Sequence, residues 1–169
     1  VLPRQVMITA NKPQGLFYGI QTLMQLLPPA IGSHSTVKGT PWEMPCVSIT
    51  DYPRFGWRGL MLDVSRHFFS KAFVKQYIDE MVKYKFNVFH WHLTDDQGWR
   101  IEIKGLPALT AKGAWRVPRT GQWNSFAPPQ PGEKTTDGGY YTQEDIREVV
   151  AYAKARFVTV VPEIDVPSH

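Results

Sequence analysis

The chain has 169 residues, of which 43% are hydrophobic, a size and composition ordinary for a single globular domain. Its formal charge of +4 comes from lysines and arginines spread along the sequence without a basic run, which argues against a nucleic-acid-binding protein. The lone cysteine, Cys46, excludes an internal disulfide, and no apolar run reaches the length of about eighteen residues that a membrane-spanning helix needs.

The first part of the chain predicts one strand and one helix. Residues 4–10 resemble a short strand, and residues 14–27 carry apolar side chains at helical spacing. Pro28 and Pro29 end this helix, because proline has no N–H to donate and restricts the residue before it. One strand and one helix cannot bury a core alone, so this part is predicted to be the end of a small α+β domain.

A linker containing several glycines and prolines follows over residues 30–52, with a brief strand predicted at residues 47–49. We place the domain boundary near residues 51–53. Residues 1–52 then form the C-terminal part of the small domain with its linker, and residues 53–169 form the beginning of a second domain.

The second part repeats strand, helix and strand. Strands are predicted at residues 58–65, 86–93 and 157–164, with helices that start after Ser70 and at Thr142. Two successive units of this kind predict a parallel sheet with helices packed outside it. The predicted fold class is therefore α/β: about the first three strands of a (β/α)8 TIM barrel, preceded by the end of a small α+β domain.

The tryptophans fall into two groups. Trp57 and Trp91 lie within predicted strands and are expected in the core. Trp99, Trp115 and Trp123 lie in loops beyond strand ends, where flat apolar rings suit either core packing or the faces of sugar rings. Composition does not choose between these two uses.

Polar residues follow each of the three predicted strands, and parallel strands bring such ends together on one rim. Arg66 follows the first strand. Its planar fork of donors suits a substrate with paired hydroxyls or a carboxylate, and equally suits an ion pair with Asp63 that holds a barrel together.

His90 and His92 are two residues apart, so they face the same way on a strand. Such a pair can bind a metal, with Asp165 or His169 as a further ligand, or can serve in hydrogen bonding and packing. Asp95 and its neighbouring carboxylate follow on the same strand, where an acid can fix the tautomer or charge of a histidine or simply form a turn.

The third strand ends in Glu163, Asp165 and His169. Glu163 and Asp165 share one face of an extended segment. Two acids and a histidine within seven residues exceed what a solvated loop requires, which predicts a functional role for at least one of them.

Five stretches together closely resemble glycoside hydrolase family 20, the β-N-acetylhexosaminidases. They are GLFYGIQTLMQLLP (15–28), RGLMLDVSRHF (58–68), HWHLTDDQGWR (90–100), GYYT (139–142) and PEIDVPSH (162–169). They occur in the family's order over nearly the whole chain. The resemblance implies a retaining enzyme that removes terminal, non-reducing β-linked N-acetylglucosamine or N-acetylgalactosamine, in which the acetamido oxygen of the substrate attacks C1.

The resemblance also implies roles for individual residues. Arg66 would bind the hydroxyls on C3 and C4 of the terminal sugar, and Asp95 with His169 would form a relay behind a glutamic acid that protonates the leaving oxygen. Glu163 and Asp165 match acids that support substrate binding. No metal and no cofactor is implied. The usual glycine before the final histidine is replaced by Ser168.

The family's adjacent Asp-Glu catalytic pair is expected beyond residue 169. The chain is therefore predicted to be an N-terminal-side fragment that is inactive alone, with the rest of the barrel supplied by a missing C-terminal part. The predicted partner is a glycan with a terminal N-acetylhexosamine, not nucleic acid or a membrane. The family implies a periplasmic, secreted or lysosomal location. Two alternatives stay open: a metal-dependent barrel hydrolase using His90 and His92, and a non-catalytic glycan-binding module.

Overall fold

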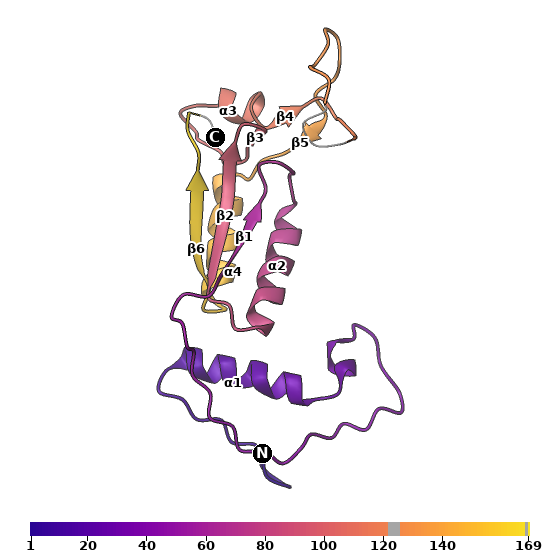
Figure 1. Cartoon of the computed structure of the whole chain (residues 1–169), viewed down its shortest axis with the longest axis vertical. Helices are drawn as coiled ribbons and strands as arrows, with labels where there is room; N and C mark the ends of the chain where they lie inside the picture. The colour runs from indigo at the N-terminus through magenta and orange to yellow at the C-terminus, as the bar shows by residue number, and fades with distance from the viewer. Residues whose placement is uncertain (122–125, 168) are drawn as a thin grey trace.

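The protein is described here by a computed structural model that covers residues 1–121, 126–167 and 169. Figure 1 shows a central group of strands with helices α2 and α4 beside it, and helix α1 near the N-terminal end. In chain order the elements are α1 (Pro13–Leu26), the 3-10 helix η1 (Pro29–Gly32), β1 (Gly59–Asp63), α2 (Lys71–Lys83), β2 (Val88–Asp95), β3 (Gly98–Trp99), α3 (Ala108–Ala111), β4 (Trp115–Arg116), β5 (Asp137–Gly138), α4 (Gln143–Lys154) and β6 (Thr159–Ile164).

The central sheet is parallel, as predicted, with β2 between β1 and β6. The short strand β3 returns antiparallel against the end of β2. The register pairs Asp63 of β1 with His92 of β2, and His92 with Glu163 of β6. Paired positions in adjacent strands point to the same face, so these three polar residues form one row across the sheet.

The two faces of β2 have opposite characters because side chains alternate along a strand. Phe89, Trp91 and Leu93 are buried in the apolar core that the sheet forms with α2 and α4. His90 and His92 lie on the opposite face, which carries the polar row. Among the described residues, no helix is long and apolar enough to cross a membrane.

Local sequence sets where the two outer helices start. The Ser70 hydroxyl accepts a hydrogen bond from the Phe73 amide at the start of α2, as predicted. Thr142 and Asp145 form a reciprocal capping box at the start of α4. Lys71 then joins the two helices through ion pairs of 2.6 Å to Asp145 and 2.5 Å to Glu148.

Polar contacts connect the N-terminal part to the sheet. The Gln25 amide donates to the Lys83 carbonyl at 2.7 Å, and Lys85 donates to the Thr22 hydroxyl at 2.6 Å. Lys85 adopts a positive φ of 62° directly after α2, a conformation that turns the chain from the helix into β2.

Three structural expectations were wrong. Residues 4–10 and 47–49 belong to none of the strands assigned in the described chain, because neither segment has a neighbouring strand to supply a hydrogen-bonded ladder. Trp57 precedes β1 and is 67% exposed, whereas Trp91 is fully buried as expected. The division of the chain near residue 53 stays a prediction.

Candidate active site

The carboxyl ends of β1, β2 and β6 bring the polar clusters of the sequence together. Asp95 is the central group: its side chain is fully buried, and its Oδ2 atom lies 2.7 Å from Arg66 Nη2, 2.9 Å from His92 Nε2 and 3.2 Å from His169 Nδ1. Its Oδ1 atom accepts the Asp96 amide at 2.7 Å. Arg66, Asp95 and His169, which are far apart in the sequence, therefore meet around one carboxylate.

Competing effects act on the acidity of Asp95. Burial by itself raises the pKa of this carboxyl, but the Asp96 amide, the His92 hydrogen bond and the charge of Arg66 lower the pKa below its usual range. Asp95 is therefore ionised at neutral pH. The stability that its ionisation contributes is present above the ordinary carboxyl pKa and is lost as pH falls through the lower folded-state value.

Arg66 forms the ion pair with Asp63 that the sequence allowed, and a second ion pair with Asp95. Its Nη1 atom lies 3.1 Å from Asp63 Oδ2 while Nη2 binds Asp95. Asp63 also accepts the Ser65 and Arg66 backbone amides through Oδ1, at 2.9 and 3.0 Å. The side chain remains 27% exposed, so the guanidinium is held from two sides and still faces solvent.

His169 lies at the outer side of this cluster. Its side chain is 67% exposed, and its backbone amide donates to Asp96 Oδ1 at 3.2 Å. With Nδ1 directed to Asp95, the Nε2 atom is left to approach a further group. Asp165 Oδ2 lies 3.6 Å from the same Nδ1, and the Thr94 hydroxyl fixes the Asp165 carbonyl at 3.1 Å. Ser168, which replaces the glycine usual in the family, lies outside the described residues.

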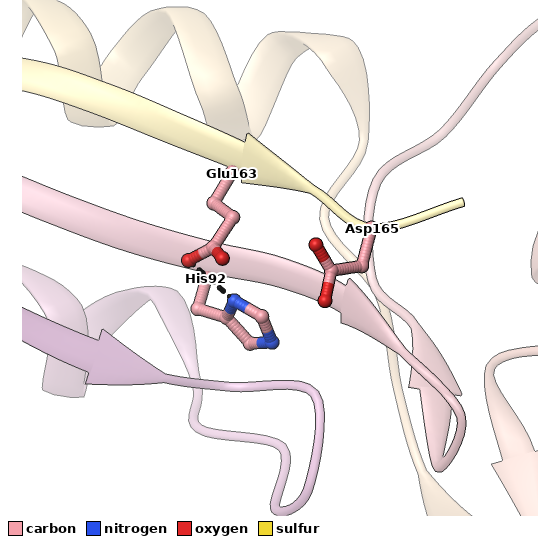
Figure 2. A group of neighbouring side chains, drawn as sticks. All are labelled: His92, Glu163 and Asp165. Carbon is pink, nitrogen blue, oxygen red and sulfur yellow. Dashed lines mark ion pairs between the residues drawn. The ribbon is translucent and has the colours of Figure 1, made fainter. Parts of the chain in front are cut away.

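Glu163 lies on β6, in register with His92 and beside two imidazoles. Figure 2 shows its carboxylate against the ring of His92, with the carboxylate of Asp165 on the neighbouring segment. Glu163 Oε2 lies 2.5 Å from His92 Nδ1 and 2.6 Å from His90 Nε2. The contact with His92 is an ion pair by distance but is not aligned as an N–H···O hydrogen bond.

These contacts determine the charges of His92 and Glu163. Burial lowers the pKa of His92, but Glu163 and Asp95 outweigh burial and raise it; His92 in turn lowers the pKa of Glu163. His92 Nε2 also lies 2.9 Å from Arg66 Nη1. Because arginine only donates, this contact is a hydrogen bond only when Nε2 is unprotonated, whereas a protonated Nε2 donates to Asp95.

Arg100 stabilises the segment that leads to Arg66. The sequence interpretation did not identify this residue. It is 1% exposed, and its guanidinium donates to four backbone carbonyls. The acceptors are Val64 (3.0 Å), Ser65 (2.7 Å), Ala114 (2.6 Å) and Gly139 (3.2 Å). The first two belong to the segment that leads to Arg66. A second arginine, Arg116, donates to the Arg66 carbonyl itself at 2.7 Å.

Nearby glycines make room for the Arg100 guanidinium. A Cβ atom at Gly98 would lie 2.3 Å from Arg100 Cζ, and one at Gly138 would lie 1.9 Å from the Ala114 carbonyl oxygen. Gly98, the glycine of the Asp-Asp-Gln-Gly turn, therefore leaves space for a neighbouring side chain. This packing function was not predicted from the turn alone.

Two groups of residues bring potential metal ligands within 4.8 Å of one another: His92, Glu163 and Asp165, and Asp95, Asp165 and His169. Within the described part of the chain His90 belongs to neither, so the ligand set built on both His90 and His92 is not assembled. Acids and imidazoles in these groups already neutralise one another through the ion pairs described above.

A cavity of about 850 Å³ is remote from this cluster. It lies between α1, residues 6–12 and the linker, and includes Arg58 and Lys85 at the base of the sheet. None of the five predicted site residues lines it. Cavity size therefore does not identify the site, whereas the convergence of charged side chains does.

Comparison with known proteins assigns the family. A sequence model of the catalytic domain of glycosyl hydrolase family 20 matches residues 55–169, and a model of domain 2 of that family matches residues 1–52. A β-hexosaminidase from Porphyromonas gingivalis is 48% identical over 98% of this chain and 20% of its own length. One from Vibrio furnissii is 46% identical, over 98% of this chain and 25% of its own.

Solved structures agree. An exo-β-N-acetylglucosaminidase of the family from Vibrio harveyi, in complex with N-acetylglucosamine, matches with a TM-score of 0.76 and 46% identity. A mutant Streptomyces plicatus β-hexosaminidase in complex with its product GlcNAc matches with a TM-score of 0.80, also at 46% identity. Each match covers 95% of this chain, and 24% and 29% of the respective solved chains.

The chain thus spans between 20% and 29% of the length of these four relatives. The similarity to these structures confirms the predicted fold class: the parallel sheet with its outer helices is part of an α/β barrel. The resemblance stated from the five sequence stretches is confirmed as well. This chain belongs to glycosyl hydrolase family 20.

Proposed function

We propose that this chain is the N-terminal-side part of a retaining β-N-acetylhexosaminidase that hydrolyses terminal, non-reducing β-linked N-acetylglucosamine or N-acetylgalactosamine. The observation that carries the proposal is the meeting of Arg66, Asp95 and His169 on the rim formed by the strand ends. Two relatives with the same fold are described as complexes with N-acetylglucosamine, which supports a sugar of this class as the substrate.

Each rim residue has a role that its contacts suit. Arg66 presents a guanidinium that is held in place by two carboxylates and is still 27% exposed, which suits contact with the C3 and C4 hydroxyls of the sugar. Asp95 orients His169, whose free Nε2 then contacts and tunes a glutamic acid supplied by a later strand. Asp165 supports the same region through His169.

The reaction needs groups from beyond residue 169. In a substrate-assisted mechanism the acetamido oxygen attacks C1 while a glutamic acid protonates the leaving oxygen, and an adjacent aspartate orients the acetamido nitrogen. An aspartate stands next to a glutamate at two places in the chain, residues 79–80 and 144–145. Both lie on outer helices, where Asp79 binds Arg156 and Asp145 binds Lys71. Neither pair lies on the rim.

The test is hydrolysis of a chromogenic N-acetyl-β-glucosaminide by the full-length protein and by the 169-residue chain. We expect the full-length protein to turn over with β-anomeric product formed first, as followed by proton NMR, and to keep its activity after treatment with a chelator. We expect the 169-residue chain to show no turnover.

Turnover by the short chain near the full-length rate would contradict the proposal, as would initial release of the α-anomer. Loss of activity on chelation, together with stoichiometric zinc in the purified protein, would favour the metal-dependent alternative.

A further inference from the structure

A chain of ionisable groups continues inward from the rim. It begins at His169 and Asp95, passes through His92 and reaches Glu163, with successive separations of 3.2, 2.9 and 2.5 Å between nitrogen and oxygen atoms. His90 closes the inner end, 2.6 Å from Glu163 Oε2. The inner half has no function in the proposed reaction, although His92, its central member, is only 5% exposed.

Two carboxylates and one guanidinium lie against the ring nitrogens of His92. Nδ1 faces a Glu163 oxygen and Nε2 faces an Asp95 oxygen. A neutral imidazole has a single N–H, so it would turn a lone pair toward one of these carboxylates at 2.5 or 2.9 Å. The side chain is 5% exposed, which leaves little water to screen that repulsion. The tautomer protonated at Nδ1 alone would accept from Arg66 Nη1 at 2.9 Å, but its Nε2 lone pair would also face the Asp95 carboxylate. An imidazolium places a positive charge between both carboxylates and donates to Asp95.

The surrounding charges favour the same state. Facing His92 are four carboxylates, one permanent cation and two further imidazoles. They are Asp63 and Arg66 from β1 and the segment after it, His90 and Asp95 from β2, and Glu163, Asp165 and His169 from β6 and the segment after it. With four carboxylates and one arginine, the pocket has an excess of negative charge, which a proton on His92 reduces.

We propose that Glu163 is a positioning residue that keeps a proton on His92, and that this imidazolium and Arg66 together hold Asp95 as the carboxylate that orients His169. Glu163 then influences the reaction without touching the sugar. This inference rests on the proposed function, since it assigns Asp95 and His169 to the relay of a hexosaminidase.

The direct test is Glu163→Gln in the full-length protein with ¹⁵N-labelled histidine. In the unsubstituted protein we expect both ring nitrogens of His92 to carry protons at pH 7. In the variant we expect one to be lost, because the glutamine keeps the size of the side chain but not its charge. This measurement does not depend on catalysis, so it distinguishes failure of the inference from failure of the proposed function.

Activity supplies a second readout. We expect Glu163→Gln to lower kcat roughly tenfold, less than the ~10²–10⁴-fold that general acid catalysis contributes in all, with a smaller change in KM. Because the substitution removes an anion that favours the charged ring, the alkaline limb of the kcat profile should move to lower pH. Glu163→Asp, which restores the charge, should bring both the ring protons and kcat back toward the unsubstituted protein.

Glu148→Gln is the matched control, because Glu148 makes its ion pairs with Lys71 and Lys75 between the outer helices. It should leave the His92 ring protons and the pH profile unchanged. A doubly protonated His92 in Glu163→Gln would overturn the proposal, and so would a pH profile for that variant identical to that of Glu148→Gln.

Discussion

Asp95→Asn is expected to lower kcat of the full-length protein by about 10²–10⁴-fold, a loss comparable to that of general acid catalysis. The substitution keeps the shape of the side chain but removes the charge that three donors share. Arg66, His92 and His169 all direct a nitrogen at Asp95 Oδ2, and an amide group cannot compensate the three. KM should rise as well, because Arg66 loses one of its two carboxylate partners. Steady-state kinetics on a chromogenic substrate measures both constants.

Asp79→Asn is the control for this prediction. The Asp79 carboxylate accepts from the Tyr152 hydroxyl and Arg156 on the outer surface, at 2.7 Å from each. The same chemical change there should leave kcat and KM nearly unaltered. If Asp95→Asn retained the kcat of the Asp79→Asn protein, Asp95 would have no part in catalysis and the relay would have to be abandoned.

Arg100→Met is expected to destabilise the protein by about 3–5 kcal/mol, because each buried carbonyl left without a donor costs about 1–3 kcal/mol. Methionine has a similar volume but leaves the carbonyls of Val64, Ser65 and Gly139 without the donor they now have. Since total stabilities are only about 5–15 kcal/mol, this loss should be evident as a large fall in the urea midpoint of unfolding.

Arg147→Met provides the comparison, since the Arg147 side chain is 67% exposed and pairs only with groups on its own helix. Its effect should stay within about 0.5 kcal/mol. Arg100→Met with a midpoint as high as that of Arg147→Met would show that the four carbonyl contacts contribute little. We expect instead that Arg100 fixes the segment that carries Arg66. Loss of Arg100 should therefore also weaken sugar binding.

The elements of the sheet and its outer helices follow from local sequence patterns. Ser70 and Thr142 mark the helix starts because their hydroxyls cap free amides, and the apolar runs of β1, β2 and β6 alternate with amphipathic helices. The rim could be predicted from the rule that parallel strands share an orientation, which placed Arg66, Asp95 and His169 together before any coordinates.

The predictions that were wrong concern segments whose structure depends on the segments packed against them, which their own sequence does not specify. Residues 4–10 have the composition of a strand, but a strand forms only where another supplies its hydrogen bonds. Trp57 is apolar but precedes β1, so it is not covered by the helices that bury Trp91.

The sites that sequence reasoning missed also depend on distant contacts. Arg100 binds carbonyls from three separate segments, and no pattern of spacing in the sequence predicts these contacts. Pairing of His92 with Glu163 depends on the register of β2 against β6. The shared face of His90 and His92 was a usable signal, but it could not reveal that an acid rather than a metal would lie between them.

The most direct measurement is a crystal structure of the full-length protein with N-acetylglucosamine bound. The account predicts the sugar at the carboxyl ends of β1, β2 and β6, with the Arg66 guanidinium on its C3 and C4 hydroxyls and His169 still hydrogen-bonded to Asp95. A sugar bound at another part of the molecule, with Arg66 and His169 contacting only protein, would contradict it.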